Sequence, residues 1–331
     1  MPHQNAPRGA PCPINPTTPI VAIVGPTGAG KSELAQKVAQ SLEAAVLSAD
    51  SMQIYQGMDI GTAKLPLEER VVPHFGIDLV APTQSYSAAD YQAYARNIIE
   101  AQTAASSGTP PVVCGGTGLY LRAALDDFDL SSLSEEQRQQ QTATRQHYEE
   151  LHRKLGAEEL HALLNKEDPE AARQIHPNNV RRVIRAFEMR AAGDSYADVK
   201  QAFKTRTSHY STLWIGLDCD RELLYQRINA RVDAMMAAGL LDEVAALLTR
   251  GYREALTASA AIGYKELVPV LEDGADLDTA VEEIKQATRR YAKRQLTWFR
   301  GDDRVCWIDV GRDSADEITQ HILQLYEQWQ L

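Results

Sequence analysis

Cysteine is scarce in this chain of 331 residues, and the sequence contains no Cys-x-x-Cys pair and no cluster of cysteine with histidine. The cysteines stand far apart, as Cys12, Cys114, Cys219 and Cys306. This spacing excludes the usual zinc sites, because those need closely grouped ligands. Isolated thiols are typical of proteins in a reducing compartment. We therefore expect a cytoplasmic protein without structural zinc.

Long apolar runs are also missing, and none approaches the roughly 18 residues that a membrane-spanning helix needs. Basic residues do not dominate: 34 Lys and Arg against 45 Asp and Glu give a formal net charge of −11. This balance excludes a protein that coats nucleic acid indiscriminately, although a local basic face remains compatible with it. With 44% hydrophobic residues, the chain has ample material for a folded core.

The first 19 residues hold six prolines and few apolar side chains. They lack the apolar stretch of a secretory signal peptide. A transit peptide is the alternative, weakened because Arg8 is their only arginine. We interpret residues 1–19 as a disordered, proline-rich tail.

Short apolar segments alternate with helical patterns along most of the remaining chain, which is typical of a doubly wound parallel α/β sheet. The predicted strands are 20–24, 44–47, 111–114, 212–218 and 305–310. The predicted helices are 31–42, 87–105, 220–249, 258–270, 277–299 and a terminal helix. Residues 126–205 are instead predicted to be a helical insertion. The α/β core then comprises residues 20–125 and 206–331.

The first predicted strand runs into a match to G-x-x-x-x-G-K-[ST], and a predicted helix follows. The match is Gly25-Pro26-Thr27-Gly28-Ala29-Gly30-Lys31-Ser32. Glycines let successive backbone N–H groups converge on phosphate oxygens, and the helix N-terminus adds its positive dipole. Lys31 supplies a mobile charge, and Ser32 offers a hydroxyl to Mg²⁺. The sequence therefore predicts a P-loop that binds a di- or triphosphate.

Other parts of nucleotide hydrolases are missing, because no clear Walker-B aspartate and no Asn-Lys-x-Asp appear. A motor or a switch GTPase is therefore disfavoured, whereas a small-molecule kinase stays open. Asp50 follows the second predicted strand, on the ligand side of such a sheet. Its position fits a general base, a magnesium partner or a turn cap. Thr117 lies in a second glycine-rich turn, where a plain tight turn is the simpler interpretation.

Several segments closely resemble the tRNA dimethylallyltransferases, also called tRNA isopentenyltransferases. They stand in family order and cover about residues 20–308: GPTGAGKS, ADSMQIYQGMDIGTAK, PHFGIDLV, YSAADY, GGTGLYL, IHPNNVRRVIRAFE, RELLYQRINARVDAM, AIGYKEL and TRRYAKRQLTWFRG. Where family loops often read Ala-Ser, this chain has Gly28-Ala29, and both pairs are small. The resemblance implies a P-loop NTPase-like fold with a helical insertion.

The resemblance also implies an activity. The family transfers a dimethylallyl group from dimethylallyl diphosphate to N6 of the adenosine 3′ of the anticodon, and diphosphate leaves. It assigns the role of general base to Asp50 and places Thr117 near the reacting centre. It assigns diphosphate binding to the P-loop, which includes Lys31, and to Arg221, with Mg²⁺ at Ser32. Arg227 and Arg231 share a helix face and are further candidates, although an exposed charged face explains them equally well.

Two local basic stretches, residues 173–190 and 285–304, stand out against the acidic total. The resemblance places contacts to the tRNA anticodon stem-loop on both, and base or loop contacts on two more segments. The implied residues are Asp50, Ser51, Met52, Gln53, Arg138, Arg181, Arg182, Arg185, Ala261, Ile262, Gly263, Tyr264, Lys265, Thr288, Arg289, Lys293, Arg294 and Gln295. Tyr264 could stack on a base, although aromatic side chains more often belong to a core.

Three alternatives remain at this point. A sister enzyme that prenylates free adenine nucleotides needs neither the insertion nor the basic stretches. A small-molecule kinase needs a nucleobase pocket that the sequence does not identify. An inert tRNA-binding protein does not need Lys31, Ser32, Asp50 and Thr117 intact. The sequence carries no dimerisation signature, so we expect a monomer.

Overall fold

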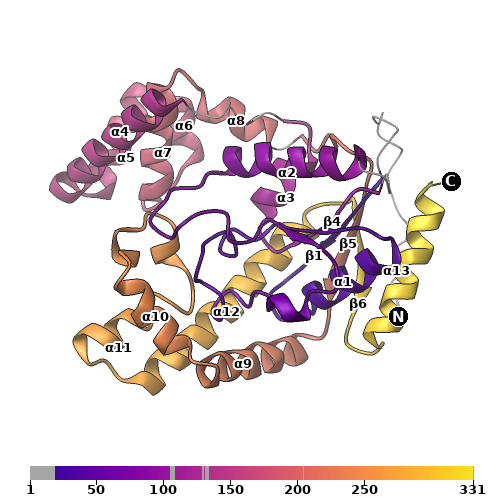
Figure 1. Ribbon diagram of the computed structural model, residues 1–331. Coiled ribbons are helices and arrows are strands. Elements are labelled where there is room, and N and C mark those ends of the chain that lie inside the picture. Colours follow the sequence, from indigo (N-terminus) through magenta and orange to yellow (C-terminus); the bar gives the residue numbers. More distant parts are fainter. Residues whose placement is uncertain (1–18, 105–108, 129, 131–133, 204, 331) are drawn as a thin grey trace. The chain divides into compact units, whose positions relative to one another are not determined.

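A parallel six-stranded sheet in the order β3-β2-β4-β1-β5-β6 lies at the centre of the larger unit of the protein (Figure 1). The computed structural model describes residues 19–330 except 105–108, 129, 131–133 and 204, and leaves out four further side chains, those of Glu135, Arg138, Ala202 and Gln330. Residues 1–18 of the predicted tail lie outside this description. The strands are β1 Ile20–Val24, β2 Val46–Ser48, β3 His74–Phe75, β4 Val112–Gly115, β5 Thr212–Asp218 and β6 Val305–Asp309.

Strand β1 lies in the middle of the sheet, paired in parallel with β4 and β5. Ile23 is opposite Cys114 on one side and Ile215 on the other. All five β1 side chains are buried, because a doubly wound sheet is covered on both faces. Ile20 belongs to one hydrophobic cluster and Val21 to the other, as the two-residue period of a strand requires.

Helices cover both faces of this sheet. On one face, α1 Lys31–Ser41 and α13 Ala315–Gln330 lie side by side (Figure 1). On the other, α2 Ala88–Ala104, α3 Gly118–Leu125 and α12 Leu277–Arg300 contribute to the second cluster. The larger unit also contains η1 Leu67–Glu69, α9 Arg221–Ala237, α10 Leu240–Leu248, η2 Tyr252–Glu254, η3 Ala258–Ala260 and α11 Val268–Asp273. No helix in the described part of the chain combines the length and apolar character needed to cross a membrane.

Two predicted helices are wrong in extent. The helix predicted over 220–249 is two helices, because Gly239 adopts the left-handed conformation, with φ of 95°, between α9 and α10. The helix predicted over 258–270 is mostly turns, with η3 at its start. Gly263 has φ of 94°, and Pro269 near the start of α11 has no N–H for an upstream helix. Strand β3, only two residues long, was not predicted.

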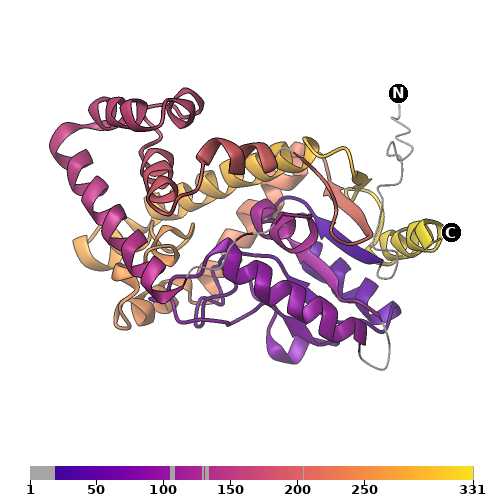
Figure 2. The ribbon, with the colours of Figure 1, turned by 90° about the horizontal axis from the view of Figure 1, so that it is seen from above.

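The smaller unit comprises residues 127–207, where a helical insertion was predicted at 126–205. Its described residues form helices and no strand (Figure 2). The helices are α4 Glu135–Leu155, α5 Ala157–Glu167, α6 Pro169–Gln174, α7 Val180–Ala191 and α8 Tyr196–Ala202. A capping box at Ser134 and Gln137 begins α4. Tyr148 stacks on Phe187 with ring centroids 3.8 Å apart, joining α4 to α7.

A buried ion cluster fastens the end of α3 to the start of β6 in the larger unit. The carboxylate of Asp126, 1% exposed, accepts from Arg122 Nε at 2.5 Å and from Arg304 Nη1 at 2.7 Å. Asp302 Oδ2 accepts a hydrogen bond from Arg304 Nη2 at 2.8 Å, and the Arg304 guanidinium lies 4.9 Å from the Trp214 ring centroid. These contacts raise the pKa of Arg304 against the effect of its burial.

We expect Asp126→Ala to lower the free energy of unfolding by about 3 kcal/mol, because it leaves two partly or fully buried arginines without their carboxylate. Urea unfolding followed by circular dichroism measures this loss. Asp303→Ala is the matched control, since Asp303 is exposed beside the cluster, and its effect should stay within about 0.5 kcal/mol. Equal losses in the two variants would contradict the assignment.

Candidate active site

The segment between β1 and α1 is the phosphate-binding loop predicted from the sequence, residues 25–32. Gly28 and Gly30 adopt φ of 84° and 82°, a conformation that costs glycine little. Lys31 is the first residue of α1, and its Nζ donates to the Pro26 carbonyl at 2.8 Å. The ammonium therefore lies over the loop, beside the backbone N–H groups that open the helix.

A cavity of about 500 Å³ lies beside this loop, and its lining residues all belong to the larger unit. Lys31, Ser32 and Asp50 line it, so the structure brings the predicted P-loop and the predicted base together. Apolar side chains form another part of its lining, namely Ile228, Val232, Met235, Ile262 and Ile284. The cavity thus offers cationic and hydroxyl groups for an anion together with a wall suited to a hydrocarbon group.

Asp50 lies two residues beyond the end of β2, and it both caps a turn and lines the cavity. Its Oδ1 accepts from the Met52 N–H at 2.8 Å, which is the capping role considered from the sequence. The residue is partly exposed and lines the cavity, so the capping bond leaves the carboxylate within reach of a ligand there. The two roles are therefore compatible in one side chain.

Thr117 joins two of the loops at the edge of the sheet. It is the N-cap residue of α3, and its Oγ1 accepts from the Ser51 N–H at 3.1 Å and donates to Ser51 Oγ at 3.3 Å. Tyr291 lies nearby, and Thr117 lowers the pKa of its hydroxyl against the effect of burial. Ser51 lines the cavity, whereas Thr117 does not. The contacts with Ser51 therefore place Thr117 just behind the cavity wall.

Burial weakens the charge on Lys31. It lowers the pKa of the ammonium to about 8, against the raising effect of Asp50, and Arg231 lowers it further. Burial also raises the pKa of the Cys114 thiol to about 11, so this neighbour stays neutral near pH 7. A diphosphate in the cavity would supply the counter-charge that Lys31 lacks.

The arginine predicted to hold diphosphate is not the one that faces the cavity. Arg221, the first residue of α9, is exposed, and its guanidinium lies 5.2 Å from the Tyr225 ring centroid. Arg227 donates to the Val310 carbonyl. Arg231 lines the cavity, and its pKa is lowered by burial and raised by Asp50. Helix α9 therefore presents Arg231 to the cavity, about three turns beyond its start, whereas Arg221 does not line it. Diphosphate binding by Arg221 stays a prediction.

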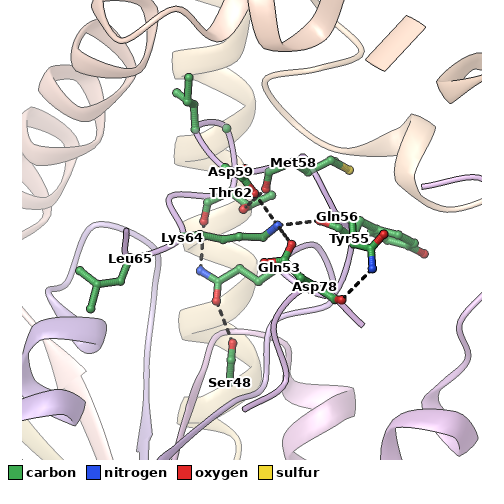
Figure 3. A network of polar contacts seen from close by, with 12 residues as sticks. Ser48, Gln53, Tyr55, Gln56, Met58, Asp59, Thr62, Lys64, Leu65 and Asp78 are labelled. Carbon is green, nitrogen blue, oxygen red and sulfur yellow. Dashed lines mark hydrogen bonds and ion pairs between the residues drawn. The ribbon is translucent and has the colours of Figure 1, made fainter. Parts of the chain in front are cut away.

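The loop after Asp50 is organised around the buried ammonium of Lys64, whose side chain is 3% exposed (Figure 3). Its Nζ donates to the Tyr55 carbonyl at 2.6 Å, to Asp59 Oδ1 at 2.7 Å and to Asp78 Oδ1 at 2.5 Å. Two carboxylates offset the cost of burying this charge. Lys64 thereby fixes the fold of the loop that forms one side of the cavity.

Gln53 lines the cavity and is held by the same loop (Figure 3). Its Oε1 accepts from Ser48 Oγ at 2.8 Å, and its Nε2 donates to the carbonyls of Thr62 and Ala63 at 3.2 and 3.5 Å. An amide nitrogen has two hydrogens, so the donor capacity of this side chain is used within the protein. Any contact of Gln53 with a base would therefore use its remaining acceptor capacity.

Tyr264 is a core residue, which excludes base stacking by this ring in the present conformation. It is fully buried, and its hydroxyl donates to Glu243 Oε1 at 2.6 Å. The other contacts of Glu243 are the backbone N–H groups of Asp59, Ile60 and Gly61, at 2.8 to 3.2 Å. This carboxylate on α10 therefore ties the loop to Tyr264. The neighbours of Tyr264 do line the cavity, namely Ala261, Ile262, Gly263 and Lys265.

The predicted tRNA contacts on α12 fall into two groups, one that lines the cavity and one on the surface of the protein. Thr288 and Arg294 line the cavity. Lys293 is exposed, and Arg289 donates to Asn229 Oδ1 on α9 at 2.6 Å. One side of α12 thus contributes to the cavity, whereas Lys293 is accessible to a large acceptor.

Two hydrogen bonds hold Gln295 within the protein. It is 5% exposed, its Oε1 accepts from the Thr27 N–H at 2.9 Å, and its Nε2 donates to the Gly116 carbonyl at 3.0 Å. These two bonds make Gln295 part of the scaffold at the cavity, which its side chain also lines. A direct contact between Gln295 and tRNA stays a prediction.

The remaining predicted tRNA contacts lie in the smaller unit. Arg181 and Arg182 are exposed on α7. Arg185 donates to Glu188 Oε2 at 3.0 Å, and Arg145 donates to Glu188 Oε1 at 2.7 Å, so these two arginines neutralise a buried carboxylate. The side chain of Arg138 lies outside the described part of the structure.

Three residues of this region were not identified from the sequence. Lys64 and Glu243 bond to backbone groups of one loop, a role that no charge pattern reveals. Tyr291 lines the cavity beside Thr117, and its pKa is raised to about 12, mainly by burial. The helical spacing of four residues between Tyr291 and Gln295 is the one signal that could have indicated a shared face.

Comparison with known proteins identifies the family. A family model described as IPP transferase matches residues 53–302, and one described as isopentenyl transferase matches residues 18–72. A tRNA dimethylallyltransferase of Carboxydothermus hydrogenoformans is 45% identical over 306 residues, which are 92% of this chain and 96% of that protein. The Bacillus subtilis protein of the same name is 44% identical over 297 residues, 89% of this chain and 92% of that protein.

Solved structures agree with the sequence comparison. The crystal structure of a tRNA isopentenylpyrophosphate transferase from Staphylococcus epidermidis has a TM-score of 0.68 at 40% identity, covering 94% of this chain and 99% of that one. A eukaryotic dimethylallyltransferase acting on tRNA has a TM-score of 0.70 at 28% identity, covering 89% and 74%. The predicted P-loop NTPase-like α/β fold is confirmed by these neighbours. The chain belongs to the IPP transferase family.

Proposed function

We propose that this protein transfers a dimethylallyl group from dimethylallyl diphosphate to N6 of the adenosine 3′ of the anticodon in tRNA, and releases diphosphate. Family membership over most of the chain supports the acceptor and the reaction. The observation that carries the chemistry is one cavity lined by Lys31, Ser32 and Asp50. It combines groups for an anionic leaving group with a carboxylate for a proton.

Departure of diphosphate is the step that the phosphate loop supports. The C–O bond to the allylic carbon breaks, the carbon gains positive charge, and the diphosphate takes the electron pair. Loop N–H groups, Lys31 and Arg231 are placed to stabilise that growing negative charge. The apolar lining, which includes Ile228 and Val232, suits the five-carbon group.

Attack by the adenosine amine is the step that Asp50 supports. The N6 lone pair is delocalised into the ring, so the amine is a weak nucleophile and improves as its proton is removed. As the N6–carbon bond forms, the carboxylate of Asp50 takes that proton. Its Oδ1 is held by the Met52 N–H, which fixes the orientation of the carboxyl group.

Magnesium fits the residues present. The hydroxyl of Ser32 lines the cavity next to Lys31. In the described residues, no three His, Cys, Asp or Glu side chains gather as metal ligands. Mg²⁺ typically binds few protein groups and takes its other ligands from phosphates and water. We propose that Ser32 holds Mg²⁺ together with the diphosphate, and that the ion, when bound, helps neutralise the leaving group.

Exposed basic residues in both units provide for a large acceptor. An adenosine within an RNA loop must leave its stack before its amine is alkylated. Arg181 and Arg182 on α7 and Lys293 on α12 are exposed cations suited to phosphates of the anticodon arm. A free nucleotide would need neither set.

The transfer reaction is tested by nucleoside mass spectrometry of unmodified tRNA incubated with the protein, Mg²⁺ and dimethylallyl diphosphate. We expect one dimethylallyl increment on the adenosine after the anticodon, and none on AMP or ADP in parallel reactions. An increment on the free nucleotide alone would contradict the proposed acceptor. No increment on either would contradict the reaction.

Asp50→Asn separates the two roles of this side chain. The amide keeps an oxygen for the Met52 N–H but does not take up the proton, so we expect kcat to fall about 10²–10⁴-fold. The affinity for tRNA and the urea midpoint should stay unchanged. Asp313→Asn, at an exposed position, is the matched control. A near-normal rate for Asp50→Asn would rule out its role as base.

Charge reversal at Arg181 and Arg182 tests the smaller unit. We expect Arg181→Glu with Arg182→Glu to weaken tRNA binding and to reduce the slope of log K against log salt by about 1.5, because two phosphate contacts are lost. Filter binding at several salt concentrations measures both. Arg153→Glu with Lys154→Glu, exposed on α4, changes the charge equally and is the control. Equal weakening by both pairs would show a general charge effect instead.

A further inference from the structure

One face of α12 packs along the Gly-Gly-Thr-Gly turn that follows β4. Tyr291 lies beside Thr117, Gln295 donates to the Gly116 carbonyl, and Trp298 lies against Gly118. The three α12 side chains are spaced by four and three residues, the spacing of one helical face. The sequence predicted tRNA contacts on this helix. Its contacts show that it also holds the glycine-rich turn after β4, beside the cavity.

Gln295 differs from its neighbours because it bonds to two loops at once. Its Oε1 accepts from the Thr27 N–H of the phosphate loop at 2.9 Å, and its Nε2 donates to Gly116 at 3.0 Å. The two partners are opposite in kind, one donor and one acceptor, so they fix which way the amide points. One buried side chain thus sets the separation of two loops that are far apart in sequence.

Glycine at position 116 is what permits this contact. A Cβ on Gly116 would lie 2.0 Å from Gln295 Nε2, and a Cβ on Gly118 would lie 2.0 Å from Trp298 Nε1. A side chain at either position would collide with the α12 residue unless that residue shifted. The glycines of this motif therefore serve the close approach of α12, in addition to any role in the turn itself.

We propose that Gln295 is a positioning residue of the donor site, which holds the phosphate loop and the Thr117 turn in the spacing that dimethylallyl diphosphate requires. This inference rests on the proposed function. It gives α12 two duties, because Lys293 and Arg294 on the same helix are available to the acceptor. If tRNA binding displaced α12, the hydrogen bond from the Thr27 N–H to the Gln295 amide would transmit that movement to the phosphate loop.

The test separates donor binding from acceptor binding. Gln295→Met keeps an unbranched side chain of similar size but loses both hydrogen bonds. We expect the KM for dimethylallyl diphosphate, and the Kd for inorganic diphosphate with Mg²⁺, to rise about tenfold. We expect kcat to fall and the Kd for tRNA alone to stay within about twofold. Gln286→Met, on an exposed position of the same helix, is the control and should leave all four unchanged.

Gln295→Glu is the second variant, and it remains informative if the methionine variant folds poorly. It keeps an acceptor for the Thr27 N–H but loses the donor to Gly116, so donor binding should again weaken with tRNA affinity preserved. Unchanged diphosphate affinity in a folded variant, or a loss confined to tRNA binding, would overturn the inference. A wild-type protein that binds diphosphate but transfers nothing to tRNA would contradict the proposed function and leave the Gln295 result to stand separately.

Discussion

Parallel pairing of β2, β4 and β1 is the constraint on which the rest of the site depends. Parallel strands end at the same edge of a sheet, so the loops that follow them meet there even though they are distant in sequence. This geometry places the phosphate loop, the Asp50 turn and the Thr117 turn side by side. The hydrogen bonds from Thr117 to Ser51 and from Gln295 to Thr27 and Gly116 then fix their spacing.

The cavity places two partly buried cationic side chains, Lys31 and Arg231, near one carboxylate, Asp50. Lys31 and Arg231 are both held where burial lowers their pKa, and Asp50 is the carboxylate that acts on both. A diphosphate entering this cavity relieves the unfavourable burial of the two cations, so donor binding is favoured by the same feature that later stabilises the leaving group. The carboxylate nearby is then available for the proton of the acceptor amine.

Sequence alone predicted the fold class, and it identified Lys31, Ser32 and Asp50, which the structure brings to one cavity, because the P-loop and the strand ends have a strong local signature. Of the arginines on α9 it favoured Arg221, whereas Arg231 lines the cavity. It missed the break at Gly239 and the turns around Gly263, where one backbone angle outweighs a helical pattern. It placed Gln295 and Tyr264 on the acceptor side. Whether a polar or aromatic residue bonds inward or faces a ligand depends on tertiary packing, which a linear pattern does not contain.

The most direct measurement is a crystal structure of the protein with Mg²⁺ and an unreactive thio-analogue of dimethylallyl diphosphate. The account predicts the diphosphate against the backbone N–H groups around Lys31, with the allylic carbon facing Asp50. It also predicts that both hydrogen bonds of Gln295 persist. A diphosphate bound away from this loop, or an allyl group directed away from Asp50, would contradict the account.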